Sequence, residues 1–165
     1  MSVEIMPICA KWDADICQII QQVGSEYGAI GDGFGPSDPE VMHMSQHYLD
    51  QHRSRYFVAL LNGNIIGGGG IAPFGSDPVI CELKKLFLLP ESRGLGIGKQ
   101  LVQTCLDYAR HKNYHRCYLD TLSSMHSAIR LYEQFGFTHL SQPLTGTIHS
   151  GCDIWMLKDL REATL

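Results

Sequence analysis

A glycine-rich segment in the middle of the chain has the residue types and spacing of an anion-binding loop. The apolar run 83–89 stops at Pro90, and the segment 91–99 (ESRGLGIGK) follows it and opens an amphipathic stretch. This order indicates a strand, a loop and a helix start. A helix start presents unpaired N–H groups and a partial positive charge, and glycines let the backbone approach a phosphate closely. The segment therefore predicts a phosphate or pyrophosphate site.

The glycine spacing excludes two widespread phosphate-binding loops. A Walker A loop needs a glycine where this chain has Arg93, and a Ser or Thr where it has Gln100. A dinucleotide fingerprint needs glycines at the first, third and sixth positions, and counting from Gly94 the sixth position is Lys99. An ordinary strand-to-helix connection, with glycines used for a tight turn, stays open as an alternative.

The remaining pattern, Arg93-x-x-Gly96-x-Gly98 just after Pro90, resembles the acetyl-CoA pyrophosphate loop of the GCN5-related N-acetyltransferase (GNAT) family. Leu119-Asp120, followed at 127–137 by SAIRLYEQFGF, is similar to the family's second signature, a strand and then a helix ending in Ala-x-x-Leu-Tyr-x-x-x-Gly-Phe. The resemblance covers about residues 81–137 closely, and the N-terminal part only in its pattern of elements. It implies an acetyl-CoA dependent N-acetyltransferase.

The resemblance also implies which residues hold the coenzyme. Loop amides would bind the pyrophosphate, with Arg93 and Lys99 as charge partners, and the preceding strand would offer its backbone to the pantetheine arm. The residues expected to bind acetyl-CoA are Leu86, Phe87, Leu88, Arg93, Gly94, Leu95, Gly96, Ile97, Gly98 and Lys99. Many relatives carry an asparagine about seven residues before the signature tyrosine, where this chain has Met125, so that contact is in question.

Two side chains match positions that handle protons in the family. A lysine-like amine with a pKa of about 10.4 is only about 0.04% neutral at pH 7, so acetyl transfer needs a base. Glu82 is the expected base and Asp120 the reserve, unless Glu82 pairs with Lys84 or Lys85 instead. Tyr132 stands where the family places its general acid; the alternative is a half-buried aromatic residue whose hydroxyl binds backbone.

The acceptor is expected to be a small polar amine, such as an amino acid or its analogue. The fold resemblance places the glycine-rich loop 28–35 and the segment 149–153 beside the acyl end, where they would close over a small molecule. The expected acceptor-site residues are Glu82, Asp120, His149, Cys152 and Asp153. A capped β-turn explains the C-terminal segment equally well. A protein amine as acceptor, and a non-catalytic acyl-CoA sensor, are the alternatives.

Composition limits the partners of the chain. A chain of 165 residues with a net charge of −4 fits one domain, residues 1–165, and argues against a nucleic-acid surface. The first residues lack a signal-peptide pattern, and no run approaches the ~20 apolar residues that cross a bilayer, so we expect a cytoplasmic protein without a membrane partner. The composition is compatible with a homodimer.

Metal and disulfide chemistry are not expected. The six cysteines are scattered without a Cys-x-x-Cys pair and indicate reduced core residues. His43 and His47 lack the glutamate that a zincin motif places between its histidines, and His149 with Cys152 completes no zinc pattern. We therefore predict acetyl-CoA as the donor and no metal.

Periodicity and turn residues give the order of elements. Strands are predicted at 3–8, 55–61, 64–72, 80–89, 116–121, 137–141 and 152–157, and Asn62-Gly63 is a hairpin turn signal between the second and the third. One helix is predicted from Asp13 to Gly24 or Gly28 and a second from Asp38 to about Gln51, with Asp13 and Asp38 as N-caps. A third helix follows the glycine loop and runs through Ala109, and a fourth ends at Gly136. Glycines 67–70 indicate either a bulge or close approach of another backbone or a ligand, or a small-residue surface under a packed helix. The family resemblance implies a single-domain α/β fold with a mixed, mostly antiparallel sheet of about seven strands flanked by about four helices.

Overall fold

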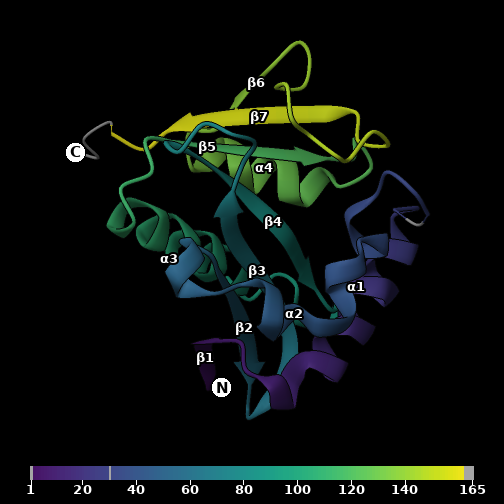
Figure 1. Ribbon diagram of the computed structural model, residues 1–165. Helices are drawn as coiled ribbons and strands as arrows, with labels where there is room; N and C mark the ends of the chain where they lie inside the picture. The colour runs from purple at the N-terminus through teal and green to yellow at the C-terminus, as the bar shows by residue number, and fades with distance from the viewer. Residues whose placement is uncertain (1, 30, 162–165) are drawn as a thin grey trace.

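A seven-stranded sheet runs through the computed structural model, which describes residues 2–29 and 31–161 (Figure 1). The strand order is β1-β2-β3-β4-β5-β7-β6, and every neighbouring pair is antiparallel except β4 and β5, which are parallel. The strands are β1 Val3–Pro7, β2 Arg55–Leu61, β3 Asn64–Pro73, β4 Ile80–Leu88, β5 Arg116–Thr121, β6 Thr138–His139 and β7 Ile154–Asp159. The mixed, mostly antiparallel sheet of the prediction is confirmed.

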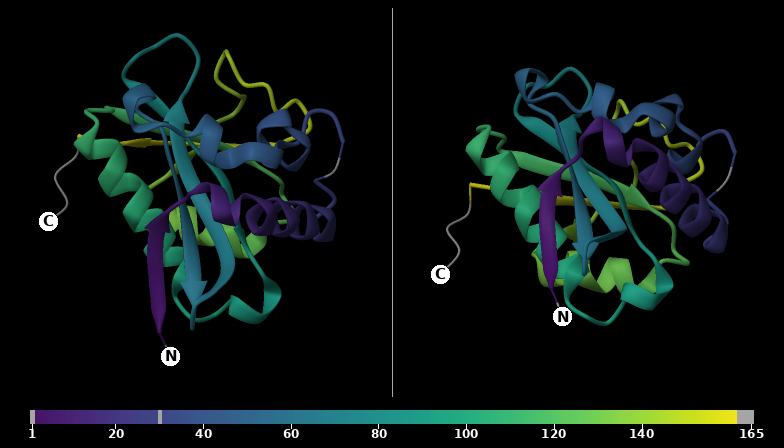
Figure 2. Two further views of the ribbon diagram at one scale, coloured as in Figure 1. Left: turned by 60° about the horizontal axis from the view of Figure 1, so that its bottom comes forward. Right: turned by 90° about the horizontal axis from the view of Figure 1, so that it is seen from below.

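Four α-helices of the described chain cover the two faces of the sheet. They are α1 Asp13–Glu26, α2 Met44–His47, α3 Ile97–His111 and α4 His126–Gln134. Short 3-10 helices lie at Ala10–Trp12, Gly35–Ser37, Pro39–His43, Asp50–His52 and Pro90–Ser92. Figure 2 shows α1 and α2 on one face of the central strands and α3 with α4 on the other. The fold is therefore the expected three-layer α/β arrangement.

Strand β2 is buried on both faces because its side chains alternate between two apolar clusters. Phe57 and Ala59 join the cluster under α3 and α4, whereas Tyr56 and Val58 join the cluster under α1 and α2. A strand covered on both faces reads as a continuous apolar run, which is why 55–61 lacks polar alternation. The sheet is thus a rigid support for groups at its strand ends.

The predicted helix from Asp38 to about Gln51 is wrong. Only α2 is α-helical in that stretch, and 3-10 turns lie before and after it. Asp38 stands at an N-cap position but makes no capping bond, because its carboxylate binds Lys85 and His149 instead. Asp13 does not cap α1 either; Trp12 holds that position, and Asp13 accepts bonds from the Ser45 backbone and hydroxyl at 2.9 and 2.6 Å.

Close approach of a neighbouring side chain explains glycines in β3. A Cβ atom on Gly68 or Gly70 would lie 2.6 or 2.7 Å from ring carbons of Tyr56, so the ring lies directly against the strand backbone. The Tyr56 hydroxyl then donates a 2.8 Å hydrogen bond to the carbonyl of Lys85 in β4. The bulge of the first interpretation is present between Gly68 and Gly70, but the group that approaches these glycines is a tyrosine side chain and not a backbone or a ligand.

The remaining sequence expectations have mixed outcomes. The Asn62-Gly63 turn has φ values of 51° and 84°, as a type I′ hairpin requires. All six cysteines are free, but Cys9 is exposed, so the expectation that every cysteine is a core residue is wrong. Among the described residues, no helix has the length and apolar character to cross a membrane.

Candidate active site

Strands β4 and β5 are joined only where they begin. Their parallel pairing runs from Ile80 with Arg116 to Glu82 with Tyr118, and the described ladder stops there. On its other side β4 stays paired with β3 as far as Leu88, opposite Gly67. Backbone groups of 83–88 that face β5 therefore have no partner in that strand. The family resemblance implied that the strand before the glycine loop offers its backbone to the pantetheine arm, and the separation of β4 from β5 leaves that edge accessible.

A β-bulge bends β4 at the point where it leaves β5. Gly68 pairs with Phe87 and Gly70 with Lys84, so β4 has one residue more than β3 between the two pairs. The extra segment includes Lys85, which adopts a positive φ of 54°. Its carbonyl is held by the Tyr56 hydroxyl. Bulges bend the strand that carries them, so this contact fixes the direction in which β4 diverges.

A cavity of about 480 Å³ lies beside the free edge of β4 and the glycine loop. Its lining residues are Val23, Tyr27, Leu86, Phe87, Leu88, Ser92, Arg93, Gly94, Gly96, Ile97, Gly98, Lys99, Met125, Ser127, Ala128, Arg130, Leu131 and Gln134. Of the residues predicted to bind the coenzyme, Leu95 alone is missing from this lining, and its side chain is exposed. Sequence reasoning missed Tyr27, Ser127 and Arg130, although Arg130 lies within the signature segment 127–137.

The glycine loop has the geometry of an anion site. Gly94 and Gly96 each have a φ of +79°, a conformation that other residues rarely adopt, and α3 begins directly after Gly96. The first N–H groups of α3 therefore face the cavity without partners inside the helix. The Ser92 hydroxyl is fully buried and has no hydrogen-bond partner among the described residues. A phosphate acceptor would satisfy these donors.

Arg93 lines the cavity but is also tied to the protein. Its guanidinium forms a salt bridge with Glu26 at 2.6 Å and donates to the Leu88 carbonyl at 2.9 and 3.2 Å. The same group lies 5.3 Å from the centre of the Tyr27 ring. Arg93 thus links the end of α1 to the end of β4. Arg93 was expected to pair with the phosphate, but in this structure its guanidinium is paired with the carboxylate of Glu26.

A second, smaller cavity of about 60 Å³ lies where β4 and β5 begin to separate. Its lining residues are Ala29, Phe34, Gly35, Pro36, Glu82, Leu83, Lys84, Lys85, Phe87, Asp120, Thr121, Leu122, Met125, His149 and Cys152. Four of the five predicted acceptor-site residues are in this group. Asp153 is not; its carboxylate accepts bonds from the Ser123 backbone and hydroxyl at 2.8 and 2.7 Å and has a structural role.

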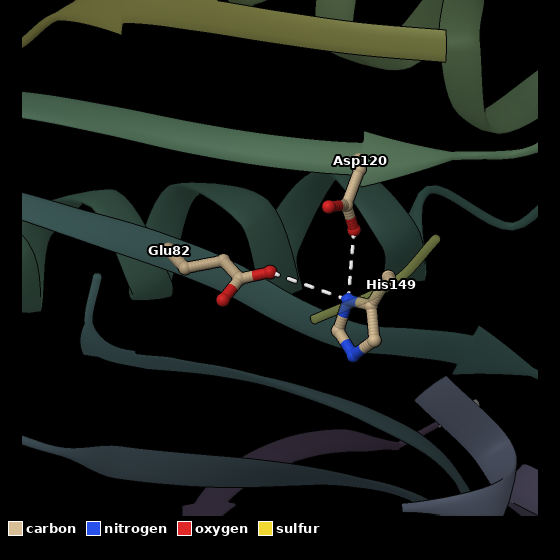
Figure 3. A group of neighbouring side chains, drawn as sticks. All are labelled: Glu82, Asp120 and His149. Atoms are coloured by element: carbon tan, nitrogen blue, oxygen red, sulfur yellow. Dashed lines mark hydrogen bonds and ion pairs between the residues drawn. The ribbon is translucent and has the colours of Figure 1, made fainter. Parts of the chain in front are cut away.

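His149 lies at the centre of the small cavity, between carboxylates from three separate segments. Its Nδ1 atom is 2.9 Å from Asp120 and 3.6 Å from Glu82 (Figure 3). Its Nε2 atom is 2.9 Å from Asp38. Burial lowers the pKa of His149, but the hydrogen bonds to Asp120 and Asp38, together with the nearby carboxylate of Glu82, outweigh it and raise this pKa to about 11. Burial raises the pKa of Asp38, yet the bond to His149 and the charge of Lys85 bring it to about 2. The ring is an imidazolium at neutral pH.

Glu82 is not paired with the lysines that follow it. Lys84 binds Glu40 at 3.1 Å, and Lys85 binds Asp38 at 2.9 Å. The ion pair recorded for Glu82 among the described residues is the 3.6 Å contact with His149. Its side chain is about nine-tenths buried. Glu82 therefore presents a carboxylate to the cavity without a close hydrogen bond.

The other two candidate reactive groups are both protonated at neutral pH. Burial raises the pKa of Tyr132 well above its ordinary value, and the ring packs edge-on against Phe137. Burial, followed by the charges of Asp120 and Glu82, raises the pKa of the Cys152 thiol to about 12. Cys152 is therefore not a nucleophile at neutral pH. Tyr132 keeps its proton, but its side chain lines neither cavity and belongs to the apolar cluster under α3 and α4.

The two loops expected beside the acceptor site do meet. The backbone N–H of Gly151 donates to the carbonyl of Gly33 at 3.0 Å, and the Phe34 ring lies against Gly151. In Figure 2 the segment after α1 and the long loop before β7 lie side by side over one end of the sheet. Residue 30 of the first loop is outside the described residues. Together the loops cover the small cavity.

The fold and the two cavities define an α/β protein with a phosphate-type site along an open strand edge, joined to a charged pocket. Residues 24–137 match the model of the acetyltransferase (GNAT) family. The Escherichia coli (strain K12) protein YjgM, described as an uncharacterized N-acetyltransferase, is 41% identical over 147 residues, which are 88% of this chain and 87% of that protein. The chain belongs to the GNAT family.

Solved structures agree on the fold. A GNAT acetyltransferase from Staphylococcus aureus Mu50 has a TM-score of 0.84 at 21% identity, with 97% of this chain and 100% of that chain covered. The Salmonella typhimurium protein yncA, solved with its cofactor acetyl-CoA, has a TM-score of 0.78 at 19% identity, with coverage of 100% and 98%. The predicted fold class is therefore confirmed.

The charge network predicts a pH-dependent difference between the parent protein and His149→Gln. The raised pKa of His149 means that its stabilising contribution is complete below about pH 6.5 and is lost as the pH rises toward about 11. The free energy of unfolding of the parent should therefore fall between about pH 7 and about pH 10, by at most about 1.4 kcal/mol per pH unit. His149→Gln should lack this slope. Urea unfolding at several pH values measures it, and parallel slopes for both proteins would contradict the charged network.

Proposed function

We propose that this protein is an acetyl-CoA dependent N-acetyltransferase that acetylates the amine of a small polar molecule, such as an amino acid or its analogue. The observation that carries the proposal is the junction of two unlike cavities at the separation of β4 and β5. One is long and ends at a glycine-rich helix start, and the other is small and lined by carboxylates. A coenzyme thioester and an amine are the two reactants that suit such a pair.

The large cavity fits coenzyme A. Its anion-binding end offers the first amides of α3 and the unpartnered hydroxyl of Ser92, with Lys99 and Arg130 on its walls. Its other wall is the free backbone edge at 86–88, which can hydrogen-bond an amide-containing arm in the manner of a strand. Acetyl-CoA would supply an activated acetyl group there. The yncA structure, which carries acetyl-CoA, supports this donor.

The small cavity fits an ammonium group. Four carboxylates and three cations gather at or directly behind its wall: Asp38, Glu40, Glu82 and Asp120, against Lys84, Lys85 and His149. This leaves one negative charge in excess. Each cation already has a carboxylate partner, whereas Glu82 has no close one. A cationic amine would therefore bind at Glu82 and balance the charge.

Glu82 and Tyr132 would then handle the protons. Glu82 accepts a proton from the bound ammonium, directly or through water, so that the nitrogen lone pair is free to attack. As the new C–N bond forms and the C–S bond breaks, Tyr132 gives its proton to the departing sulfur, and the second proton that the nitrogen loses passes through water to restore the tyrosine. Asp120, bound to His149 and Thr147, is held in place and is the less suitable base.

The first prediction from this proposal concerns the glycine loop. Gly96→Trp should abolish binding of acetyl-CoA, because a side chain at a φ of +79° strains the start of α3 and obstructs the cavity. Gly63→Trp is the matched control, since Gly63 also has a positive φ and open space but lies in the β2–β3 turn. Calorimetry measures both. Equal affinity for both folded variants would mean that the loop is only a connection.

The second prediction concerns proton transfer. Tyr132→Phe and Glu82→Gln should each lower turnover by roughly 10² to 10⁴ while affinity for acetyl-CoA stays nearly unchanged. Tyr114→Phe, a buried tyrosine outside both cavities, is the control. If both variants keep the parent rate, these two roles are wrongly assigned.

The third prediction concerns the acceptor. Pooled amino acids, polyamines and lysine-containing peptides are incubated with acetyl-CoA, and mass spectrometry identifies the products. Acetylated small amines are expected, because the acceptor cavity is only about 60 Å³ and is covered by two loops. Acetylation of the peptides alone would overturn the small-molecule proposal. Acetyl-CoA binding without any product would favour a sensor.

A further inference from the structure

The two cavities have two lining residues in common, Phe87 and Met125. Phe87 lies in the part of β4 that is not paired with β5, and Met125 directly precedes α4. If the coenzyme lies in the large cavity and the amine in the small one, the acyl carbon has to pass between these two side chains to react. Phe87 and Met125 thus form the partition that the acyl group meets.

The space beyond this partition is limited. The small cavity measures about 60 Å³, against about 480 Å³ on the coenzyme side. It has to hold the amine end of the acceptor together with whatever part of the acyl group extends past the thioester carbon. Its other walls are the charged side chains around His149 and the two covering loops. A longer acyl chain would compete with the acceptor for this volume.

We propose that Met125, packed beside Phe87, sets the length of the acyl group that this enzyme accepts, favouring acetyl over chains of four carbons or more. The inference rests on the proposed function, since it takes acetyl-CoA as the donor. In an apolar pocket each additional methylene changes discrimination by about 10- to 200-fold. A partition of two apolar side chains is sufficient for such selection.

Met125 is the adjustable side of the partition, and Phe87 is the fixed side. Phe87 is 8% exposed and belongs to the apolar cluster under α1, and its backbone is paired with Gly68. Met125 is only partly buried, and the Thr121 hydroxyl contacts its sulfur at 3.5 Å. A methionine side chain is unbranched and fills irregular gaps, so its truncation enlarges the opening with little effect on the core.

The test compares binding of coenzyme A, acetyl-CoA and butyryl-CoA to the parent, Met125→Ala and Met125→Leu by calorimetry, which needs no acceptor. Met125→Ala should raise the affinity for butyryl-CoA relative to coenzyme A by about tenfold, because room for the acyl chain is added. Met125→Leu keeps the volume and should retain the parent ratio. Met42→Ala is the control, because it truncates an exposed methionine that lines neither cavity.

A variant with the opposite expected effect on acyl binding tests the inference even if Met125→Ala impairs folding. Met125→Phe narrows the partition and should weaken acetyl-CoA binding relative to coenzyme A. Equal changes for all three ligands in Met125→Ala and Met125→Phe would overturn the inference, because Met125 would then be only a wall of the coenzyme cavity. If the binding ratios shift but no tested amine releases free thiol from acetyl-CoA, the proposed function is contradicted, whereas the inference about Met125 still holds.

Discussion

The separation of β4 from β5 is the constraint on which both cavities depend. Parallel strands normally stay paired along their length, and an unpaired buried backbone group costs free energy comparable to a lost hydrogen bond. Here the pairing stops at Glu82, and the bulge at Lys85 directs β4 away. The Tyr56 hydroxyl holds the bulge, and its ring needs the glycines of β3. The site is therefore supported from the layer behind it, by residues that touch neither cavity.

The charged groups of the small cavity act as the second constraint. A buried charge is tolerated when it is paired, and removal of one partner leaves the other uncompensated. His149 meets this condition by contacting Asp38, Glu82 and Asp120, and Lys85 meets it through Asp38. These contacts bring the segment after α1, the start of β4, the end of β5 and the loop before β7 to one point. The chemistry of the pocket and its shape thus depend on the same ion pairs.

What the sequence could predict follows from how local each feature is. The glycine loop, the end of β4 and the start of α3 are consecutive, so their spacing indicated an anion site, and the family resemblance added half of the lining of the large cavity. Asp38 was assigned to a helix cap by its neighbours Pro39 and Glu40. Its actual partner, His149, is 111 positions away. Asp38 pairs with His149 instead of capping the helix, because a buried imidazolium without carboxylate partners costs more free energy than a short helix without a cap. No spacing rule could have shown this.

The two cavities differ in the same way, because the large one is lined mainly by one continuous part of the chain and the small one by distant segments. The family match spans residues 24–137, which includes the glycine loop, the signature helix and nearly all of the lining of the large cavity. His149 and Cys152 lie beyond it, on a loop held by Gly33 and by the carboxylates of the sheet. The proposed donor site is therefore built from the segment that matches the family. The proposed acceptor site is built from contacts between distant segments, so a change in one loop would alter that site while the large cavity stays the same.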